Sequence, residues 1–538
     1  MPVWFAACGA GHAPEVAAPV RPVAKPQPAP STIPEPAPTA RSGDPLDALH
    51  VRIRYAQENG PLGIYAVAPT ILRNGAQEVP LAAGQWRLSV THVRPAQQRF
   101  HVFPKTFQPG EETALEAYLA SWRQQGYQPS IEVFGKQFQA GTRAIDNRQF
   151  WVSLARVPTQ AAAEALIARL KPQQVWAWSR AETIVPGAAM LLVQGQDGAT
   201  MAQVTLPATL ECSAPVSLMN IDNGFWNEVR ADRVYQAPLS LEIGPQGTLE
   251  VLGELPVETY LLGVLPAEMP ATWPPEALAA QAIAARSEVL FNLAGKHRLE
   301  GFDFCALEHC RAYGGIAAHL PGTDNAVRAT TSEVLVTGHR SVPTVFCANC
   351  GGWTENNEVV WAGPANASLR AVPDFPLAAR PPALGPVSRW VFGAPPAYCA
   401  ADKANFRWTR RYTTAELSAL VNKWHNIGTI QRIEPGERGT GGRLKSCRIT
   451  GSAGSATPDR ELNIRLAFGG LPSAVFSVEN VGGVFTFTGA GRGHGVGLCQ
   501  QGARAMALEG LGHEEILRHY FSGAELERLG GDGFQGPG

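Results

Sequence analysis

Glu268 is the residue of this sequence that is best suited to act as an acid in a reaction. It stands in a short segment between Pro266 and Pro270, after an apolar run from Tyr260 to Leu265. A carboxyl group held in a stiff loop against a buried helix is expected to have a raised pKa, which a general acid needs near neutral pH. The alternative is a surface carboxylate near the start of a helix, where the helix dipole favours its charge.

A helix is predicted to follow this segment and to position it. Pro275 suits the first turn, where its missing N–H costs nothing, and Thr272 can cap the helix slightly upstream. Beyond Pro275, apolar residues recur at helical spacing and form one face: Leu278, Ala282, Ala285, Val289 and Leu293. Glu268 is therefore expected in a loop beside a helix with a buried apolar face.

The segment from Glu254 to Ser287 resembles the core motif of the stage II sporulation protein D family. Members of this family are bacterial peptidoglycan lytic transglycosylases and the related amidase-enhancer proteins. The resemblance implies that Glu268, in the Glu-Met-Pro motif, is the catalytic acid. It also implies that Arg286 pairs with Glu268 or binds a substrate oxygen, and a salt bridge that packs the helix is the alternative.

Two thiols and an imidazole follow within one loop, at Cys305, His309 and Cys310, with His297 just upstream. Tetrahedral zinc uses such ligands, although their spacing differs from that of common zinc fingers. Some members of the resembled family carry zinc at a corresponding cluster. A Cys305–Cys310 disulfide and free thiols are the alternatives, and either zinc or the disulfide would hold the segment after the helix in place. No cofactor is predicted to be required for catalysis.

A second motif of the resembled family runs from Val345 to Asn356 and contains Gly-Gly-x-Thr-Glu. The resemblance implies that Glu355 binds substrate, whereas Cys347 departs from the family pattern. Cys347 and Cys350 form a Cys-x-x-Cys, but no thioredoxin-like context surrounds it. A disulfide or a contribution to the zinc site is therefore preferred over redox chemistry.

A third motif, Gly491 to Ala503, places alternating glycines around one histidine, so that the backbone can approach a ligand closely. It resembles the closing Gly-His-Gly-Val-Gly motif of the same family, which implies that His494, Gly495 and Gln500 bind substrate. Cys499 stands where the family usually has Ser, and Gln501 where it has an aromatic residue. A structural histidine in a tight loop is the alternative.

The length of 538 residues, with 45% apolar residues, predicts two or three domains. The net charge of −1 gives no basis for a nucleic-acid partner. Residues 1–8 resemble a lipoprotein signal remnant in which Cys8 would be lipidated and anchor the chain to a membrane. Few residues precede Cys8, so a free cysteine in a disordered tail is the alternative. Residues 9–44 are a Pro/Ala-rich linker.

The rest of the chain predicts an α+β protein, with a β-rich catalytic domain that contains a few helices and a smaller β-α-β-β-α-β module. Alternating strands occupy 49–95, the module occupies 98–184, and the catalytic domain occupies 188–530. The sequence leaves open whether 49–95 belongs to the catalytic domain, with the module as an insertion. Residues 150–170 resemble part of the sporulation-related repeat (SPOR) domain, which implies glycan binding on an exposed sheet face. A ferredoxin-like packing module is the alternative.

The resemblance predicts a lytic transglycosylase that cleaves peptidoglycan strands freed of stem peptides and forms 1,6-anhydro-muramic ends. It also predicts a location in the bacterial cell envelope and an N-acetylmuramoyl-L-alanine amidase as partner. A hydrolase would need a second carboxylate, for which Glu355 and Glu258 are the candidates. The competing function is a glycan-binding scaffold without catalysis that enhances the amidase.

Overall fold

The structure is a computed structural model that describes residues 49–75, 77–140, 143–222, 230–307, 309–361, 363–376, 393 and 395–529. Cys8 and the 9–44 linker lie outside these residues. The described chain forms two compact units. The N-terminal unit holds residues 49–271, 289–332 and 528–529, and the C-terminal unit holds 272–288 and 333–527.

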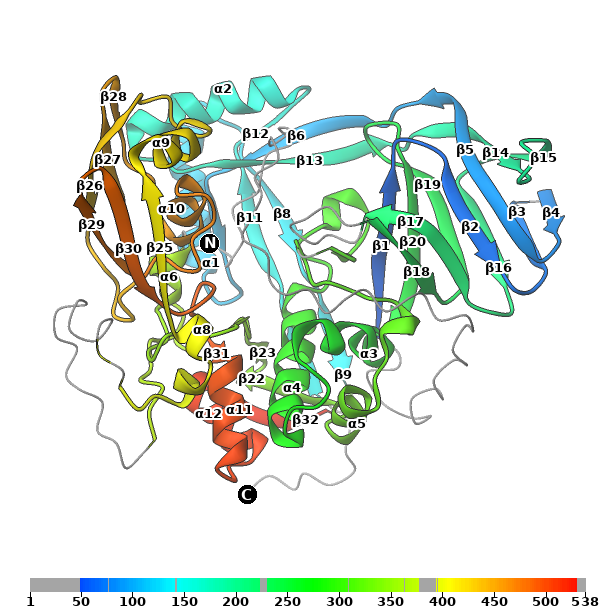
Figure 1. Ribbon diagram of the computed structural model, residues 1–538. Helices are drawn as coiled ribbons and strands as arrows, with labels where there is room; N and C mark the ends of the chain where they lie inside the picture. The colour runs from blue at the N-terminus through cyan, green and yellow to red at the C-terminus, as the bar shows by residue number, and fades with distance from the viewer. Residues whose placement is uncertain are drawn as a thin grey trace. The chain divides into compact units, whose positions relative to one another are not determined.

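Both units mix helices with several sheets, which confirms the predicted α+β class (Figure 1). Among the described residues, helices fall short of the length and apolar character needed to cross a membrane. The predicted domain over 188–530 is divided between the two units.

Two large antiparallel sheets form most of the N-terminal unit. The first has the order β21-β1-β20-β19-β16-β3-β4, with bounds Phe304–Cys305, His50–Glu58, Leu249–Pro256, Leu239–Ile243, Ala208–Cys212, Thr70–Asn74 and Gln77–Leu81; only β21 runs parallel to its neighbour. The second has the order β15-β14-β5-β2-β17-β18, with bounds Thr200–Leu206, Ala188–Gln194, Gly84–Arg94, Leu62–Ala66, Val216–Asp222 and Arg230–Tyr235.

The β-α-β-β-α-β module is an insertion between two paired strands. β5 and β14 pair antiparallel although residues 95–187 separate them in the sequence. β1 likewise pairs with β20, so that the strands of 49–94 and those of 188–256 share the same sheets. Of the two arrangements that the sequence left open, the structure has the one in which 49–95 and the later strands form one body.

The module itself has ferredoxin-like topology. Its elements are β6 (Gln97–Phe103), β7 (Lys105–Phe107), α1 (Glu112–Gln124), β8 (Ser130–Phe134), a β9–β10 hairpin (Gln137–Ala140, Arg143–Asp146), β11 (Gln149–Ser153), β12 (Ala155–Val157), α2 (Gln160–Leu170), η1 (Lys171–Gln173) and β13 (Trp178–Val185). β8 pairs with β11, β11 and β12 pair with β7 and β6, and β6 pairs with β13. The last strand, β13, begins only at Trp178, after η1 and a short connection.

The sheet face of the module that points away from α1 and α2 is buried. Phe103, Phe134 and Trp151 pack together on it and are 0–2% exposed. The guanidinium of Arg298 lies 5.6 Å from the centre of the Phe134 ring, and the Gly135 N–H donates to the Ala294 carbonyl at 2.7 Å. The exposed sheet face expected from the SPOR resemblance is therefore wrong, because the chain after the Arg286 helix lies against it.

The remaining elements of the N-terminal unit are mostly helical: α3 (Val257–Glu268), η2 (Arg298–Glu300), η3 (Ile316–Ala318) and α5 (Pro321–Ala329). α4 (Pro275–Asn292) begins at the predicted proline. Most of α4 belongs to the C-terminal unit, and the chain re-enters the N-terminal unit from Val289.

The C-terminal unit contains small sheets. These are β23-β22-β32 (Arg340–Ser341, Glu333–Thr337, Glu525–Arg528), β24-β31 (Phe346–Cys347, Leu498–Cys499), β25-β30-β29 (Arg407–Thr413, Val484–Ala490, Phe476–Val481) and β26-β27-β28 (Ile430–Pro435, Cys447–Gly451, Gly454–Ala456). Its short helices are α6 (Asn357–Val360), η4 (Tyr398–Ala401), α8 (Lys403–Phe406), α9 (Thr414–Asn422), α10 (Glu461–Ala467), α11 (Gln500–Leu508) and α12 (His513–Tyr520).

The core of this unit forms where α9 and α10 pack on the β25-β30-β29 and β26-β27-β28 sheets. Its buried residues include Trp408, Leu417, Ile464 and Phe487. α9 starts with a capping box, in which Thr413 accepts from the Glu416 N–H and Glu416 accepts from the Thr413 N–H.

Candidate active site

Glu268 is the last residue of α3 and not part of a loop. α3 follows Pro256 and is buried along nearly its whole apolar length. It ends at Glu268 because Met269 is extended, with φ −134° and ψ 142°, as the residue before a proline prefers. The predicted loop was wrong because the helix continues through Pro266.

The Glu268 side chain is 20% exposed, so a ligand can reach it. Its Oε1 lies 4.0 Å from Nε of Arg311, which belongs to the same unit. The C-terminal end of a helix disfavours a negative charge, whereas a neighbouring guanidinium favours it. The two effects oppose each other at this carboxyl group.

Close packing against α3 brings Arg311 to Glu268. A Cβ atom on Gly263 would lie 2.3 Å from the Tyr313 ring, so that only glycine allows this approach. The Gly314 N–H donates to the Gly263 carbonyl at 3.0 Å, and Tyr313 also packs against Tyr260 of α3. The segment around Arg311 thus lies along the helix that ends in Glu268, which no sequence pattern indicated.

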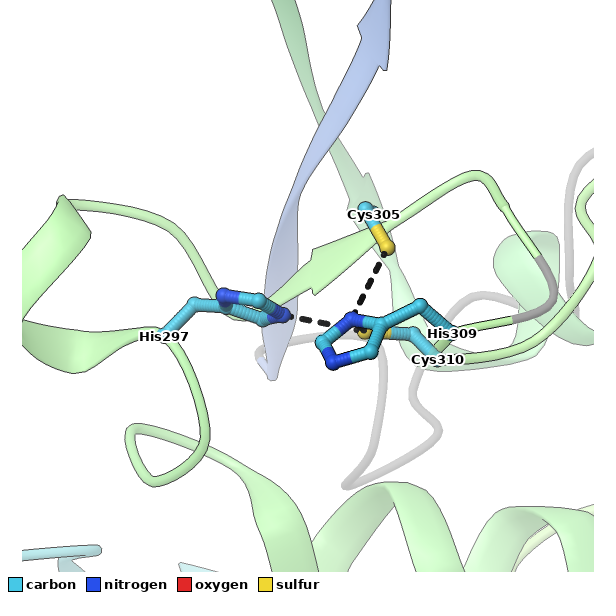
Figure 2. Close-up of side chains that lie close together, drawn as sticks. All are labelled: His297, Cys305, His309 and Cys310. Atoms are coloured by element: carbon cyan, nitrogen blue, oxygen red, sulfur yellow. Dashed lines mark hydrogen bonds between the residues drawn. The ribbon is translucent and has the colours of Figure 1, made fainter. Parts of the chain in front are cut away.

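The cysteines and histidines ahead of Arg311 converge on one point (Figure 2). Donor atoms of His297, Cys305, His309 and Cys310 all lie within 4.8 Å of one another. Nε2 of His297 is 3.2 Å from Sγ of Cys310, and Nδ1 of His309 is 3.6 Å from Sγ of Cys305. The structure therefore brings the three predicted ligands together and adds His297 as a fourth.

Hydrogen bonds orient one of these imidazoles and lower the pKa of one of the thiols, and both effects favour binding of a metal ion. Nδ1 of His297 lies 2.8 Å from the Glu300 carboxylate, so the proton belongs on Nδ1 and the lone pair of Nε2 faces Cys310. A hydrogen bond from Cys310 lowers the pKa of Cys305 to about 6 despite its burial. Two thiols and two imidazoles are a donor set that suits tetrahedral zinc. The residues present thus fit the ion that the resemblance implied.

In the C-terminal unit, Glu355 is fully buried and anchors a loop. Its carboxylate accepts from the N–H groups of Gly441 at 3.0 Å and Arg443 at 3.1 Å. Burial raises the pKa of Glu355 in spite of these donors and the nearby Arg443 guanidinium. The predicted substrate contact does not agree with this burial, and the role of the side chain is structural.

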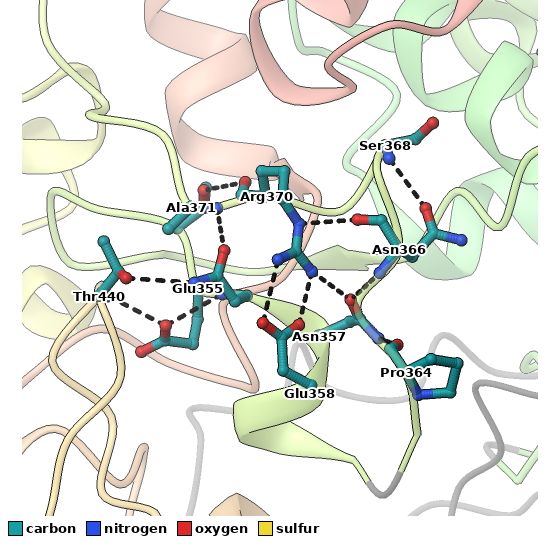
Figure 3. Close-up of polar contacts among 12 residues, drawn as sticks. Glu355, Asn357, Glu358, Pro364, Asn366, Ser368, Arg370, Ala371 and Thr440 are labelled. Atoms are coloured by element: carbon teal, nitrogen blue, oxygen red, sulfur yellow. Dashed lines mark hydrogen bonds and ion pairs between the residues drawn. The ribbon is translucent and has the colours of Figure 1, made fainter. Parts of the chain in front are cut away.

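Hydrogen bonds also tie together the chain around Glu355 (Figure 3). Arg370 donates to the carboxylate of Glu358 at 3.0 Å and to the carbonyl of Asn366 at 2.7 Å. The amide of Asn356 donates to Oγ1 of Thr440 at 3.1 Å. The Gly-Gly-x-Thr-Glu segment is therefore held on both sides by neighbouring loops.

The Gly-His loop contacts Glu355 directly. The Gly495 carbonyl accepts from the Glu355 N–H at 2.8 Å, and the Gly493 carbonyl accepts from the Arg443 guanidinium at 3.0 Å. Gly495 has φ +73°, and a Cβ there would lie 2.0 Å from Cζ of Arg443. Two motifs that lie far apart in the sequence thus form one network around Arg443, which the sequence did not indicate.

His494 is half-buried in this loop, with its ring 4.9 Å from that of Trp361. Nδ1 of His494 accepts from the Val496 N–H at 3.1 Å, so the ring proton of the neutral form belongs on Nε2. This hydrogen bond fixes the orientation of the imidazole within the Gly-His loop.

Arg286 and Gln500 are buried side chains of the same unit. Arg286 is 0% exposed and donates to the Glu333 carbonyl at 3.0 Å, while Gln500 lies 3.4 Å from the Gln281 amide on α4. The burial of Arg286 disagrees with a direct substrate contact, and its bond to the first residue of β22 gives it a packing role in this unit.

The predicted site residues are divided between the units. Glu268 and the cluster of Figure 2 lie in the N-terminal unit, and Arg286, Glu355, His494, Gly495 and Gln500 lie in the C-terminal unit. Cys347 and Cys350 also lie in the C-terminal unit, whereas the cluster at His297, to whose predicted zinc site they were expected to contribute, lies in the N-terminal unit.

The stage II sporulation protein family matches residues 245–336, which include α3, α4 and the cysteine–histidine cluster. The chain therefore carries a domain of this family, and its relatives include proteins named stage II sporulation protein D and amidase enhancer. A domain of unknown function (DUF8618) matches residues 356–497. Stage II sporulation protein D of Bacillus subtilis is 25% identical over 314 residues, which cover 55% of this chain and 81% of that protein.

Two further relatives cover about half of the chain. An uncharacterised protein of Brachyspira hyodysenteriae is 29% identical over 281 residues, which is 52% of this chain and 68% of that protein. The amidase enhancer of Bacillus subtilis is 26% identical over 299 residues, which is 49% of this chain and 40% of that protein.

Proposed function

We propose that this chain is a lytic transglycosylase of the bacterial cell envelope that cleaves peptidoglycan strands freed of stem peptides. One observation carries the proposal. Within the matched family region, a partly exposed carboxyl group, that of Glu268, ends a buried helix next to Arg311. This arrangement suits a group that must hold a proton, release it and take one back.

The reaction needs one protein carboxyl group. Glu268 donates its proton to the glycosidic oxygen as the bond from that oxygen to C1 of the muramic acid breaks. The resulting carboxylate takes the proton of the C6 hydroxyl while O6 bonds to C1, which closes a 1,6-anhydro ring. Glu268 ends protonated as it began, no water is consumed, and no atom changes its oxidation state overall.

The charges around Glu268 support both halves of this cycle. The end of α3 favours the neutral acid before proton donation, and Arg311 stabilises the carboxylate after it. Neither candidate for a second carboxylate is accessible: Glu355 is 0% exposed, and Glu258 is 4% exposed and accepts from the Ser332 N–H. A hydrolase would need two carboxyl groups at the substrate, about 5 to 10 Å apart.

We include a structural zinc ion in this proposal, held by His297, Cys305, His309 and Cys310. Zinc would supply no chemistry to the reaction, and its four protein ligands would fix the fold of the loop. Cys310 directly precedes Arg311, so a fixed loop would hold the guanidinium beside Glu268.

The substrate and the partner follow from the same proposal. A glycan strand without stem peptides is the product of an N-acetylmuramoyl-L-alanine amidase, so such an amidase would act first and this chain second. Both would act in cell-wall remodelling, in the envelope. The SPOR assignment of the inserted module stays a prediction, and it needs a binding surface other than the buried sheet face.

The test is a digest of amidase-treated peptidoglycan, with the products identified by mass spectrometry. Wild type is expected to release anhydro-muramic ends, and Glu268→Gln is expected to release none while it still binds the glycan. Glu116→Gln is the matched control, because Glu116 is an exposed carboxylate on α1 of the same unit. Reducing ends from wild type, or undiminished activity of Glu268→Gln, would overturn the proposal.

A second candidate function is a glycan-binding scaffold that stimulates an amidase without catalysis. The similarity to the amidase enhancer favours it. In this case Glu268→Gln would stimulate a purified amidase as well as wild type does, and neither protein would form anhydro ends. The same two proteins thus distinguish the two functions.

A further inference from the structure

Four buried side chains that can bind a metal ion meet inside the C-terminal unit. Cys350, Asp374, Cys399 and Cys499 each offer one donor atom, and these atoms all lie within 4.8 Å of one another. All four residues are 0% exposed. An aspartate without solvent is costly unless a cation or hydrogen-bond donors compensate it, so this cluster needs an explanation.

The fold brings these side chains together from distant parts of the sequence. Cys499 ends β31, which pairs in parallel with β24, and Cys350 follows β24 by three residues. Cys399 lies in η4, and the Asp374 backbone is fixed by hydrogen bonds to Gly352 and Tyr398. Four separate stretches of chain therefore end at one buried point.

The spacing of the donors fits a single tetrahedral ion. The Cys350 and Cys399 sulfurs are 3.7 Å apart. Two thiolates on one zinc ion lie about 3.8 Å apart, given Zn–S bonds of about 2.3 Å and tetrahedral angles. A disulfide would instead require about 2.05 Å. Since all four donors lie within 4.8 Å, they surround the space of one ion.

Neighbouring groups orient the carboxylate and one sulfur. Oδ1 of Asp374 accepts from the Tyr520 hydroxyl at 2.6 Å, and Oδ2 accepts from the Cys399 N–H at 3.1 Å. Sγ of Cys499 accepts from the Cys350 N–H at 3.2 Å. Outer hydrogen bonds of this kind hold metal ligands in their binding orientation.

We propose that Cys350, Asp374, Cys399 and Cys499 bind one zinc ion, distinct from the ion proposed at His297. Three thiolates select a soft or borderline cation, which excludes calcium and magnesium. Binding displaces the thiol protons to solvent and changes no oxidation state. Cys347 lies opposite Cys499 in the β24–β31 pair but is not one of the four residues whose donor atoms converge, so we do not assign it as a ligand.

The site is closed, and its role is structural. Four protein ligands fill the tetrahedral positions, which leaves none for water or substrate. The ion would hold Cys499, the residue that caps α11, at a fixed position five residues after His494. It would also fix Cys350, which precedes the Gly-Gly turn. The inference does not rest on the proposed activity.

The test measures the zinc content of a background variant that lacks the two cysteines of the His297 cluster. Full-length Cys305→Ser/Cys310→Ser is purified under reducing conditions, and its zinc content is measured by mass spectrometry. We expect one zinc ion per chain, which the further change Cys399→Ser removes. Cys447→Ser is the matched control, because Cys447 is equally buried in the same unit but outside the cluster, and it should leave the count unchanged.

X-ray absorption on the same background keeps the proposal falsifiable if Cys399→Ser does not fold. We expect three sulfur ligands at about 2.3 Å and one oxygen at about 2.0 Å. Absence of zinc from the folded background protein, or a Cys350–Cys399 disulfide in the reduced preparation, would overturn the site. Four sulfur ligands would overturn the assignment of Asp374.

Discussion

Gly495 is a position in the Gly-His loop where one added methyl group should be damaging. Its φ is +73°, and a Cβ there would lie 2.0 Å from Cζ of Arg443, a distance that forces the guanidinium to move. Gly523 of the same unit has φ +68° and open space around its Cβ position, so Gly523→Ala is the matched control. The two substitutions share the backbone strain and differ in the clash.

The expected cost follows from these two contributions. An alanine in left-handed backbone costs about 1–2 kcal/mol at either position. At Gly495 the clash also displaces the Arg443 guanidinium, which is 0% exposed, donates to the Gly493 carbonyl at 3.0 Å and favours the charge of the buried Glu355 carboxylate. Disturbing the partner of a buried charge costs about 3–5 kcal/mol more. We therefore expect about 4–7 kcal/mol for Gly495→Ala against about 1–2 kcal/mol for Gly523→Ala.

Urea unfolding followed by tryptophan fluorescence measures both variants, with Trp361 reporting next to His494. Gly495→Ala should unfold at a much lower urea concentration than Gly523→Ala, whose midpoint should fall only by the equivalent of about 1–2 kcal/mol below wild type. Midpoints that agree within the equivalent of about 1 kcal/mol would refute the argument that the Arg443 network fixes this loop.

Three further predictions concern side chains outside this loop. Arg311→Met removes the cation beside Glu268, the proposed acid, and we expect turnover of denuded glycan to fall about tenfold or more with little change in KM; an unchanged turnover number would contradict this role. Glu300→Gln weakens the orientation of the buried His297 imidazole in the first proposed zinc site, and competition with a chelator should show about 10–100-fold weaker zinc binding, whereas equal affinity would rule the effect out. Hydrogen bonds to Glu333 and Glu276 raise the pKa of His513 to about 9, so its stabilisation is complete below pH 6.5 and is lost as the pH rises through 9. His513→Asn should therefore cost about 1–2 kcal/mol near pH 6 and almost nothing above pH 9 in unfolding measurements, and a pH-independent cost would disprove the linkage.

The sequence alone predicted those elements whose formation depends on residues close together in the chain. The helical spacing of apolar residues after Pro275 predicted α4, because one face of a helix repeats every three to four residues. The order of strands and helices between 98 and 184 predicted the inserted module for a similar reason. The motif around Glu268 indicated the family, which the match over 245–336 bears out.

Only the tertiary structure showed the contacts and the burial that depend on residues far apart in the chain. Glu268 and Arg311 meet only because Gly263 lets the chain around Tyr313 lie on α3. The burial of Glu355, and of the module's sheet face, depends on which segment covers them, and residue type does not specify that segment.

The cysteines show most clearly the difference between what the sequence predicts and what the tertiary structure adds. Their sequence spacing left zinc and disulfides open, because thiols close in sequence can serve either. The sequence already placed His297, Cys305, His309 and Cys310 close together, and the fold brings their donor atoms within 4.8 Å of one another. Only the fold gathers Cys350 with Cys399, Cys499 and Asp374. A metal site requires donors at defined distances in space, and distances between residues far apart in the chain are set by packing.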